Sequence, residues 1–134
     1  MSKIYRHSPA SPDDLLGRVD AKTGEVFRTH LGPDKLIGRV ELDTGKVYIK
    51  RLGPDKFLGH VDFKSGKIRH HRLGPDDYLG RVEKDGKLYR HVPVGIDEYL
   101  GKVTDMHSFA EGGAAFLLFF LEEELSELEE ETEE

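Results

Sequence analysis

The sequence contains no cysteine and no hydrophobic run of membrane-spanning length. The lack of cysteine excludes a disulfide framework and thiolate metal sites, and it fits a reducing compartment. Residues 1–7 contain no apolar run long enough for a signal peptide, and the apolar segment at 112–121 is shorter than the roughly 20 residues that cross a bilayer. The chain of 134 residues, 37% hydrophobic, is long enough for one domain. We therefore expect a cytoplasmic, single-domain protein with no membrane association.

Basic residues are also absent from the C-terminal part of the chain. All 20 Lys and Arg precede residue 111, whereas residues 111–134 contain ten Glu. The excess positive charge of residues 1–110 is small and spread evenly along the sequence, which predicts no nucleic-acid binding. The Glu residues from Glu122 onward either keep an apolar helix end soluble or bind a basic face of this chain or of a neighbour.

A short phrase, Leu-Gly-base-Val, is present five times, first as Leu16-Gly17-Arg18-Val19 and once with Ile37 in place of Leu. Its glycines are spaced 21 residues apart, at Gly17, Gly38, Gly59, Gly80 and Gly101. So regular a period identifies a repeat protein.

Each repeat contains two short stretches that are typical of β-strands. The first includes the phrase, as in residues 35–41, and the second follows a glycine turn, as in Glu25-Val26-Phe27-Arg28. Turns such as Lys22-Thr23-Gly24 fit tight hairpins, and Gly32-Pro33-Asp34 fits a turn between units. Because these connections are too short for a crossover helix, the strands are expected to run antiparallel as a meander.

The fourth hairpin turn is one residue shorter than the others, and the period is restored before Gly101. This predicts a β-bulge or an altered turn near Val92-Pro93.

The two ends of the chain complete each other. The fifth repeat lacks a second strand, and the N-terminal segment Lys3-Ile4-Tyr5-Arg6-His7 matches the missing one. We therefore predict an all-β fold in residues 1–108: a closed, five-fold, barrel-like ring of 21-residue hairpin repeats with ten short antiparallel strands. Residues 109–134 are predicted to form an apolar and then acidic C-terminal helix and tail.

The segment from Ala114 to Leu121 is rich in strong helix formers and is apolar on every face, so it must be surrounded. We expect it to fill the ring as a plug, with the repeat valines facing inward and the repeat glycines admitting the helix backbone. Six residues carry this prediction: Phe116, Leu117, Leu118, Phe119, Phe120 and Leu121.

An alternative use of the same helix is a seam between copies of the chain. The heptad spacing of Ala114, Leu118, Leu121, Leu125 and Leu128 favours a homo-oligomer. Both arrangements hold together if Leu125 and Leu128 extend beyond the ring.

The tandem Leu-Gly-Arg-Val units, the closing terminal strands and the Gly112-Gly113-Ala114-Ala115 helix resemble the bacterial β-flower repeat proteins, in a five-fold version. The resemblance covers about residues 3–121. It implies the symmetric all-β fold and brings no catalytic residues and no cofactor.

Three sets of polar residues recur at the repeat period. The first is a basic set on the strand, a candidate anion ring: Arg18, Arg39, His60, Arg81 and Lys102. Its simpler interpretation is an outer face with cross-strand ion pairs to Asp20, Glu41, Asp62 and Glu83. The others are the turn residues Asp13, Asp34, Asp55, Asp76 and Asp97, which could bind a hard cation or their own turns, and His7, His71 and His91.

A lysine at the histidine position, Lys50, argues against a zinc site, so no metal is predicted. No nucleophile–base pair or phosphate-binding motif is present, and no repeat has a carboxylate pocket of its own. The sequence therefore predicts a non-enzymatic structural or protein-interaction module, or alternatively a small-ligand or ion-binding protein that uses one of these rings.

Overall fold

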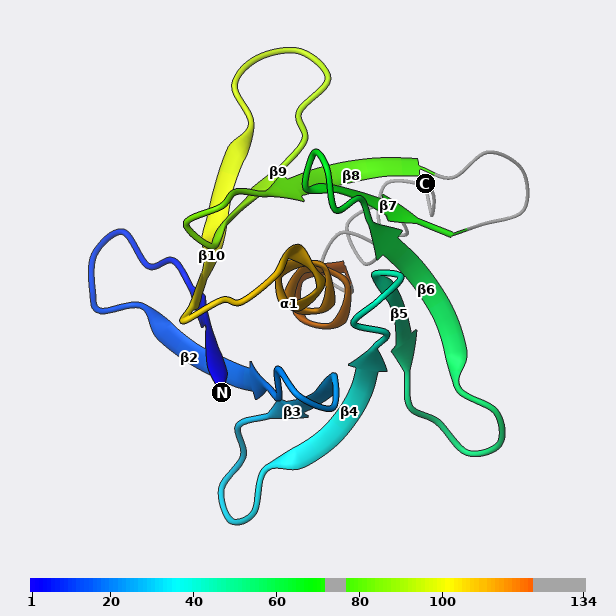
Figure 1. Cartoon of the computed structure of the whole chain (residues 1–134). Helices are drawn as coiled ribbons and strands as arrows, with labels where there is room; N and C mark the ends of the chain where they lie inside the picture. Colours follow the sequence, from blue (N-terminus) through cyan, green and yellow to red (C-terminus); the bar gives the residue numbers. More distant parts are fainter. Residues whose placement is uncertain (72–76, 122–134) are drawn as a thin grey trace, which may run out of the picture.

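In the computed structural model, which describes residues 1–71 and 77–121, strands form a closed barrel around a central helix (Figure 1). Each strand pairs antiparallel with its neighbours in sequence, and β1 closes the barrel against β10. The strands are β1 Ser2–Arg6, β2 Asp14–Val19, β3 Glu25–Arg28, β4 Lys35–Val40, β5 Lys46–Ile49, β6 Lys56–Val61, β7 Lys67–His70, β8 Asp77–Val82, β9 Lys87–Arg90 and β10 Glu98–Thr104. The predicted closed barrel of hairpins and its closure by the N-terminal strand are confirmed.

The inner face of the barrel is built by strand alternation, because residues two apart point to the same side. The valine of every phrase is buried, with at most 2% of its surface exposed, as predicted. The second strand of each hairpin adds one more buried aliphatic side chain, at Ile4, Val26, Val47, Ile68 and Leu88. These two layers form the wall of the core.

Every repeat also contains a β-bulge, whereas the sequence predicted one irregularity, a bulge or an altered turn near Val92-Pro93. In β3 and β4, Val26 faces Gly38 but Phe27 faces Leu36, so that Ile37 has no partner in the register. The same shift skips the residue before the repeat glycine in all five repeats. The phrase is therefore the sequence of a bulge. The extra residue of the fourth unit lies in the loop 91–97, which is longer than its counterpart 29–34.

Each of four hairpin turns is hydrogen-bonded to the next hairpin along the chain. Gly24, Gly45, Gly66 and Gly86 have φ between 75° and 91°, where a Cβ would be strained. The carbonyl of each accepts a hydrogen bond from the valine of the next hairpin, as from Val40 to Gly24 at 2.8 Å. Each turn glycine thus fixes the position of the next hairpin relative to its own.

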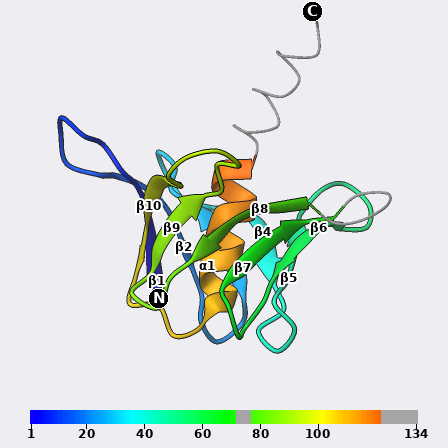
Figure 2. The same cartoon turned by 90° about the horizontal axis from the view of Figure 1, so that it is seen from above.

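The central helix enters the barrel at the hairpin-turn end and runs towards the opposite end (Figure 2). It consists of α1, Phe109–Ala115, followed by a π-helical turn η1, Phe116–Phe120. It begins before Ala114, where the run of strong helix formers starts. The buried carboxylate of Glu111 explains this, because its Oε2 accepts hydrogen bonds from the backbone N–H groups of His107 at 2.6 Å and Ser108 at 2.8 Å.

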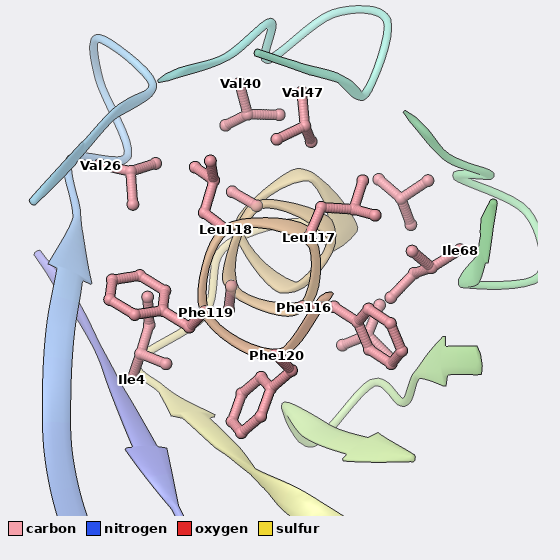
Figure 3. Packing of buried hydrophobic residues seen from close by; sticks show 14 of the residues in the cluster. Ile4, Val26, Val40, Val47, Ile68, Phe116, Leu117, Leu118, Phe119 and Phe120 are labelled. Carbon is pink, nitrogen blue, oxygen red and sulfur yellow. The ribbon is translucent and has the colours of Figure 1, made fainter. Parts of the chain in front are cut away.

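The π-helical turn sends five consecutive large side chains in different directions (Figure 3). Phe116 lies at Gly80 in β8, Leu118 at Gly38 in β4, and Phe119 at Gly17 in β2. Leu117 lines a cavity with Leu58 of β6, and the Arg6 guanidinium of β1 lies 5.9 Å from the Phe120 ring. An α-helix returns to the same direction after 3.6 residues, whereas the wider turn gives each of the five hairpins one side chain.

All six predicted plug residues are buried, with at most 6% of their surface exposed. The prediction that the repeat glycines admit the helix backbone is wrong in its detail. A Cβ on Gly17 would lie 2.6 Å from the Phe119 ring and 2.2 Å from the carbonyl oxygen of Phe27, so a side chain and a neighbouring strand fill this space. The close backbone approach occurs at Gly112 and Gly113 of the helix, which pack on Val82 and Val61.

The alternative seam between copies loses part of its surface. Ala114, Leu118 and Leu121 are inside this chain's own barrel, and Leu125 and Leu128 lie outside the described residues. Among residues 1–71 and 77–121, no helix is both long and apolar enough to span a bilayer.

Candidate functional site

The predicted basic ring lies on the outer face, where Arg18, Arg39, Arg81 and Lys102 bind aspartates of the loops between hairpins. Arg18 Nε lies 2.9 Å from Asp34 Oδ2, Arg39 Nε lies 3.3 Å from Asp55 Oδ2, and Arg81 pairs with Asp97. Lys102 reaches Asp13 at 3.9 Å, which continues the pattern across the chain ends. The partners predicted two residues along the strand lie farther from these arginines, at 4.0 Å for Arg39 and Glu41 and 3.5 Å for Arg81 and Glu83.

The three arginines of the outer ring also pack on aromatic side chains. The guanidinium carbons of Arg18, Arg39 and Arg81 lie 4.1–4.4 Å from ring centroids of Phe27, Tyr48 and Tyr89. A base that is held between a carboxylate and an aromatic ring is already neutralised and oriented. This arrangement favours a structural role for the outer ring over an anion site.

The aspartates of the predicted Asp ring link strand to loop. Asp97 accepts a hydrogen bond from the Val92 backbone N–H at 3.1 Å, and Asp13 accepts one from Ser8 N–H at 3.1 Å. This agrees with the predicted turn chemistry for the loops that contain Asp13 and Asp97. The carboxylates of Asp34 and Asp55 instead accept hydrogen bonds from arginines. Asp76 lies outside the described residues.

Replacing Asp97 by Asn is expected to make the free energy of unfolding less dependent on pH at acidic pH. The Val92 hydrogen bond, helped by Arg81 and His91, holds the pKa of Asp97 below its ordinary value despite partial desolvation. A carboxyl whose pKa is lower in the folded state stabilises the fold above the unfolded pKa of about 4 and loses this contribution as the pH falls further. Urea unfolding from pH 7 to pH 2 should show the free-energy gap between wild type and Asp97→Asn closing below pH 4. A constant gap over the whole range would contradict this role.

The histidines of the predicted His ring lie apart, each against an aromatic ring of a neighbouring strand. The ring centroids of His7 and Tyr99 are 4.9 Å apart, and those of His71 and Phe57 and of His91 and Tyr78 are 4.7 Å apart. In the described part of the chain, no three His, Asp or Glu side chains are close enough together to hold a metal ion.

A second ring, of four polar residues and one isoleucine, points inward, and it is not among the rings predicted from the sequence. It lies at the end of the barrel that carries the loops between hairpins, here called the mouth, and it consists of Arg6, Arg28, Ile49, His70 and Arg90. Each member is two residues beyond a buried aliphatic residue, so alternation turns it towards the helix. The Arg28 guanidinium lies 5.4 Å from the Phe119 ring. The signal in the sequence for this ring is the period-2 alternation of the second strand of each hairpin, which places these residues on the same face as the buried aliphatic ones.

The strand register makes this mouth ring uneven in charge. At three positions a basic residue faces an acidic one across the strand pair: Arg6 and Asp14, His70 and Asp77, Arg90 and Glu98. At the other two positions the facing residue is a lysine: Arg28 and Lys35, Ile49 and Lys56. The repeats thus differ in charge at this end, where a site can form.

The part of the mouth that carries Lys35 and Lys56 also contains a groove. A groove of about 740 Å³ lies between β3, β4 and β5, and a second cavity of about 290 Å³ shares three of its lining residues, Ile49, Arg51 and Leu118. We call the two together the mouth groove. Its exposed basic residues are Arg28, Lys35, Lys50, Arg51 and Lys56, and its apolar lining includes Leu36, Ile37, Ile49, Leu117, Leu118 and Leu121.

The opposite end of the barrel carries a smaller cavity of about 300 Å³, lined by Phe63, Lys84, Met106 and the first residues of the helix segment. Nearby, Glu111 is 1% exposed, and its Oε1 lies 3.7 Å from His107 Nδ1. The hydrogen bonds to the helix start account for the burial of Glu111 Oε2, whereas Oε1 has no hydrogen-bond partner among the described residues. This cavity is much smaller than the mouth groove, which is the stronger candidate for a binding site.

No protein-family model, no curated protein and no solved structure matches the chain. The resemblance to the β-flower proteins stays a prediction.

Proposed function

We propose that the protein is a non-enzymatic interaction module whose mouth groove binds an acidic, amphipathic segment of a protein partner. The observation that carries the proposal is the pair of lysines, Lys35 and Lys56, at positions where other repeats have Asp or Glu. They leave one sector of the mouth rich in positive charge above an apolar floor.

The chemistry of the groove favours a peptide over a nucleic acid. Its floor is aliphatic, formed by Ile37, Ile49 and Leu118, and no aromatic side chain is among its lining residues. Proteins that bind single-stranded nucleic acid stack bases on aromatic rings, which this floor does not offer. A peptide helix with leucines on one face and glutamates beside them matches both the floor and the rim.

The groove is also too extended for a single small anion. Its basic residues come from β3, β4, the loop 50–55 and β6, and all five are exposed. Exposed ion pairs contribute about 0–1 kcal/mol each, so useful affinity needs several pairs together with apolar burial. A partner that spans the groove meets both conditions.

Charge reversal in the groove tests the proposal. The probe is a labelled synthetic peptide with Leu at helical spacing and Glu at the other positions, measured by fluorescence anisotropy. The protein carries Gln in place of the nine Glu of residues 122–134, so that its own charges do not compete. Adding Lys35→Glu, Lys50→Glu and Arg51→Glu is expected to weaken binding roughly tenfold or more, because three attractions become repulsions.

The matched control reverses three exposed lysines at the hairpin-turn end, Lys22, Lys46 and Lys64, and should bind the peptide like the parent. Equal binding by the groove variant would overturn the proposal. Tighter binding of a single-stranded oligonucleotide than of the peptide would assign the groove to nucleic acid instead.

A further inference from the structure

The chain leaves the barrel at the edge of the mouth groove. Leu121 is 2% exposed and lines the smaller cavity together with Leu118 and Ile49. The next residue in the sequence is Glu122. Whatever follows Leu121 therefore starts next to the basic residues of the groove.

The sequence that follows has the composition that the groove selects. Residues 122–134 contain nine Glu, two Leu and no basic residue. The five basic residues of the groove carry the opposite charge, and its aliphatic floor suits leucine side chains. This complementarity pairs a segment and a surface of one chain.

The segment is long enough to reach every part of the groove. Thirteen residues span about 40 Å when extended, against about 20 Å for the longer strands of the barrel wall. A short tether gives an effective concentration in the millimolar range, well above that of a second copy in dilute solution. Binding within one chain is thus favoured over binding between chains.

We propose that residues 122–134 occupy the mouth groove of their own chain and compete there with the acidic partner. The inference rests on the proposed function, and it adds regulation: a partner binds only by displacing the segment. If the segment fills the groove nine-tenths of the time, the apparent affinity for a partner falls about tenfold. Salt weakens this occupancy, because the contacts are between exposed charges.

Zero-length crosslinking of the full wild-type chain tests the contact directly. A carbodiimide joins a lysine to a carboxylate only when the two are in contact, and Lys35, Lys50 and Lys56 are the reporters. We expect crosslinks from these lysines to the Glu residues of 122–134, and fewer from Lys22 and Lys64 at the opposite end. Equal yields at both ends would overturn the inference.

An equimolar mixture of isotope-labelled and unlabelled protein separates binding within a chain from binding between copies. Crosslinks within one isotope form support the proposal. Crosslinks that join the two forms at the frequency of random pairing would assign the segment to a second copy and overturn it.

Peptide binding separates the failure of this inference from that of the proposed function. Wild type should bind the acidic peptide about tenfold more weakly than the Gln-substituted chain at low salt, and the two should converge at about 1 M salt. Equal binding at low salt overturns self-occupancy and leaves the proposed function standing. If neither protein binds the peptide while the crosslinks form within the chain, the proposed function fails and the contact remains.

Discussion

A chain that ends at His107 is expected to lose its cooperative unfolding transition. It lacks the whole helix, including the six plug residues, none of which is more than 6% exposed. Burial of the five side chains of the π-helical turn contributes on the order of 10 kcal/mol, at about 1.5–3 kcal/mol each. A domain is typically stable by about 5–15 kcal/mol, so the loss is comparable with the total.

Circular dichroism with urea and thermal unfolding measures this directly. A milder variant, Phe116→Ala, keeps the helix and is expected to cost about 3–5 kcal/mol, which a full-length chain can report as a shifted midpoint. Adding a synthetic peptide of residues 108–134 to the shortened chain should restore the transition. A shortened chain that unfolds cooperatively at the wild-type midpoint would contradict the role of the helix as a core.

Light scattering of the same two proteins addresses the predicted homo-oligomer. If the shortened chain is folded and monomeric while the full chain is an oligomer, the helix serves assembly. The burial of Ala114 and Leu118 within one barrel favours the other outcome.

The substitution Gly17→Ala is expected to lower the free energy of unfolding by about 3 kcal/mol, the upper end of the cost of overpacking. The new methyl group would lie 2.2 Å from the Phe27 carbonyl oxygen and 2.6 Å from the Phe119 ring. The ring tip can move, but the carbonyl belongs to the paired strand and cannot move without breaking the sheet.

Two matched variants divide this cost. In Gly59→Ala the nearest atoms belong to the paired strand and none to the helix, so its difference from Gly17→Ala reports the Phe119 contact. In Gly53→Ala no atom lies within 4 Å but φ is 86°, so only the strain of about 1–2 kcal/mol remains. Chemical denaturation of the three variants should rank Gly53→Ala as the mildest. A Gly17→Ala protein within 1 kcal/mol of wild type would contradict the packing argument.

Much of the fold could be predicted from the sequence because the same pattern of strand and turn residues occurs in successive repeats. The period of 21 residues, the missing second strand after Val103 and the match at Ile4 and Tyr5 were sufficient for a closed ring. The apolar run after Gly113 required an enclosure, and the predicted ring could provide it.

The parts that could not be predicted depend on register and on helix geometry. A bulge leaves the period intact, so the sequence gives no sign that Leu16 or Ile37 is skipped in the pairing. The early start of the helix had a local signal, Ser108 followed by Glu111, which the two glycines between Glu111 and Ala114 obscured. The mouth groove follows from which residue faces Arg28 or Ile49 across the sheet, and spacing along the chain does not reveal that.

The number of large side chains in the π-helical turn matches the number of hairpins in the barrel. Its five side chains meet five hairpins one by one, from Phe116 at β8 around to Phe120 at β1. A chain that gained or lost one 21-residue unit by duplication or deletion would have a hairpin without a side chain, or a side chain without a hairpin. The size of this barrel is therefore tied to a segment outside the repeats, and the two can change only together.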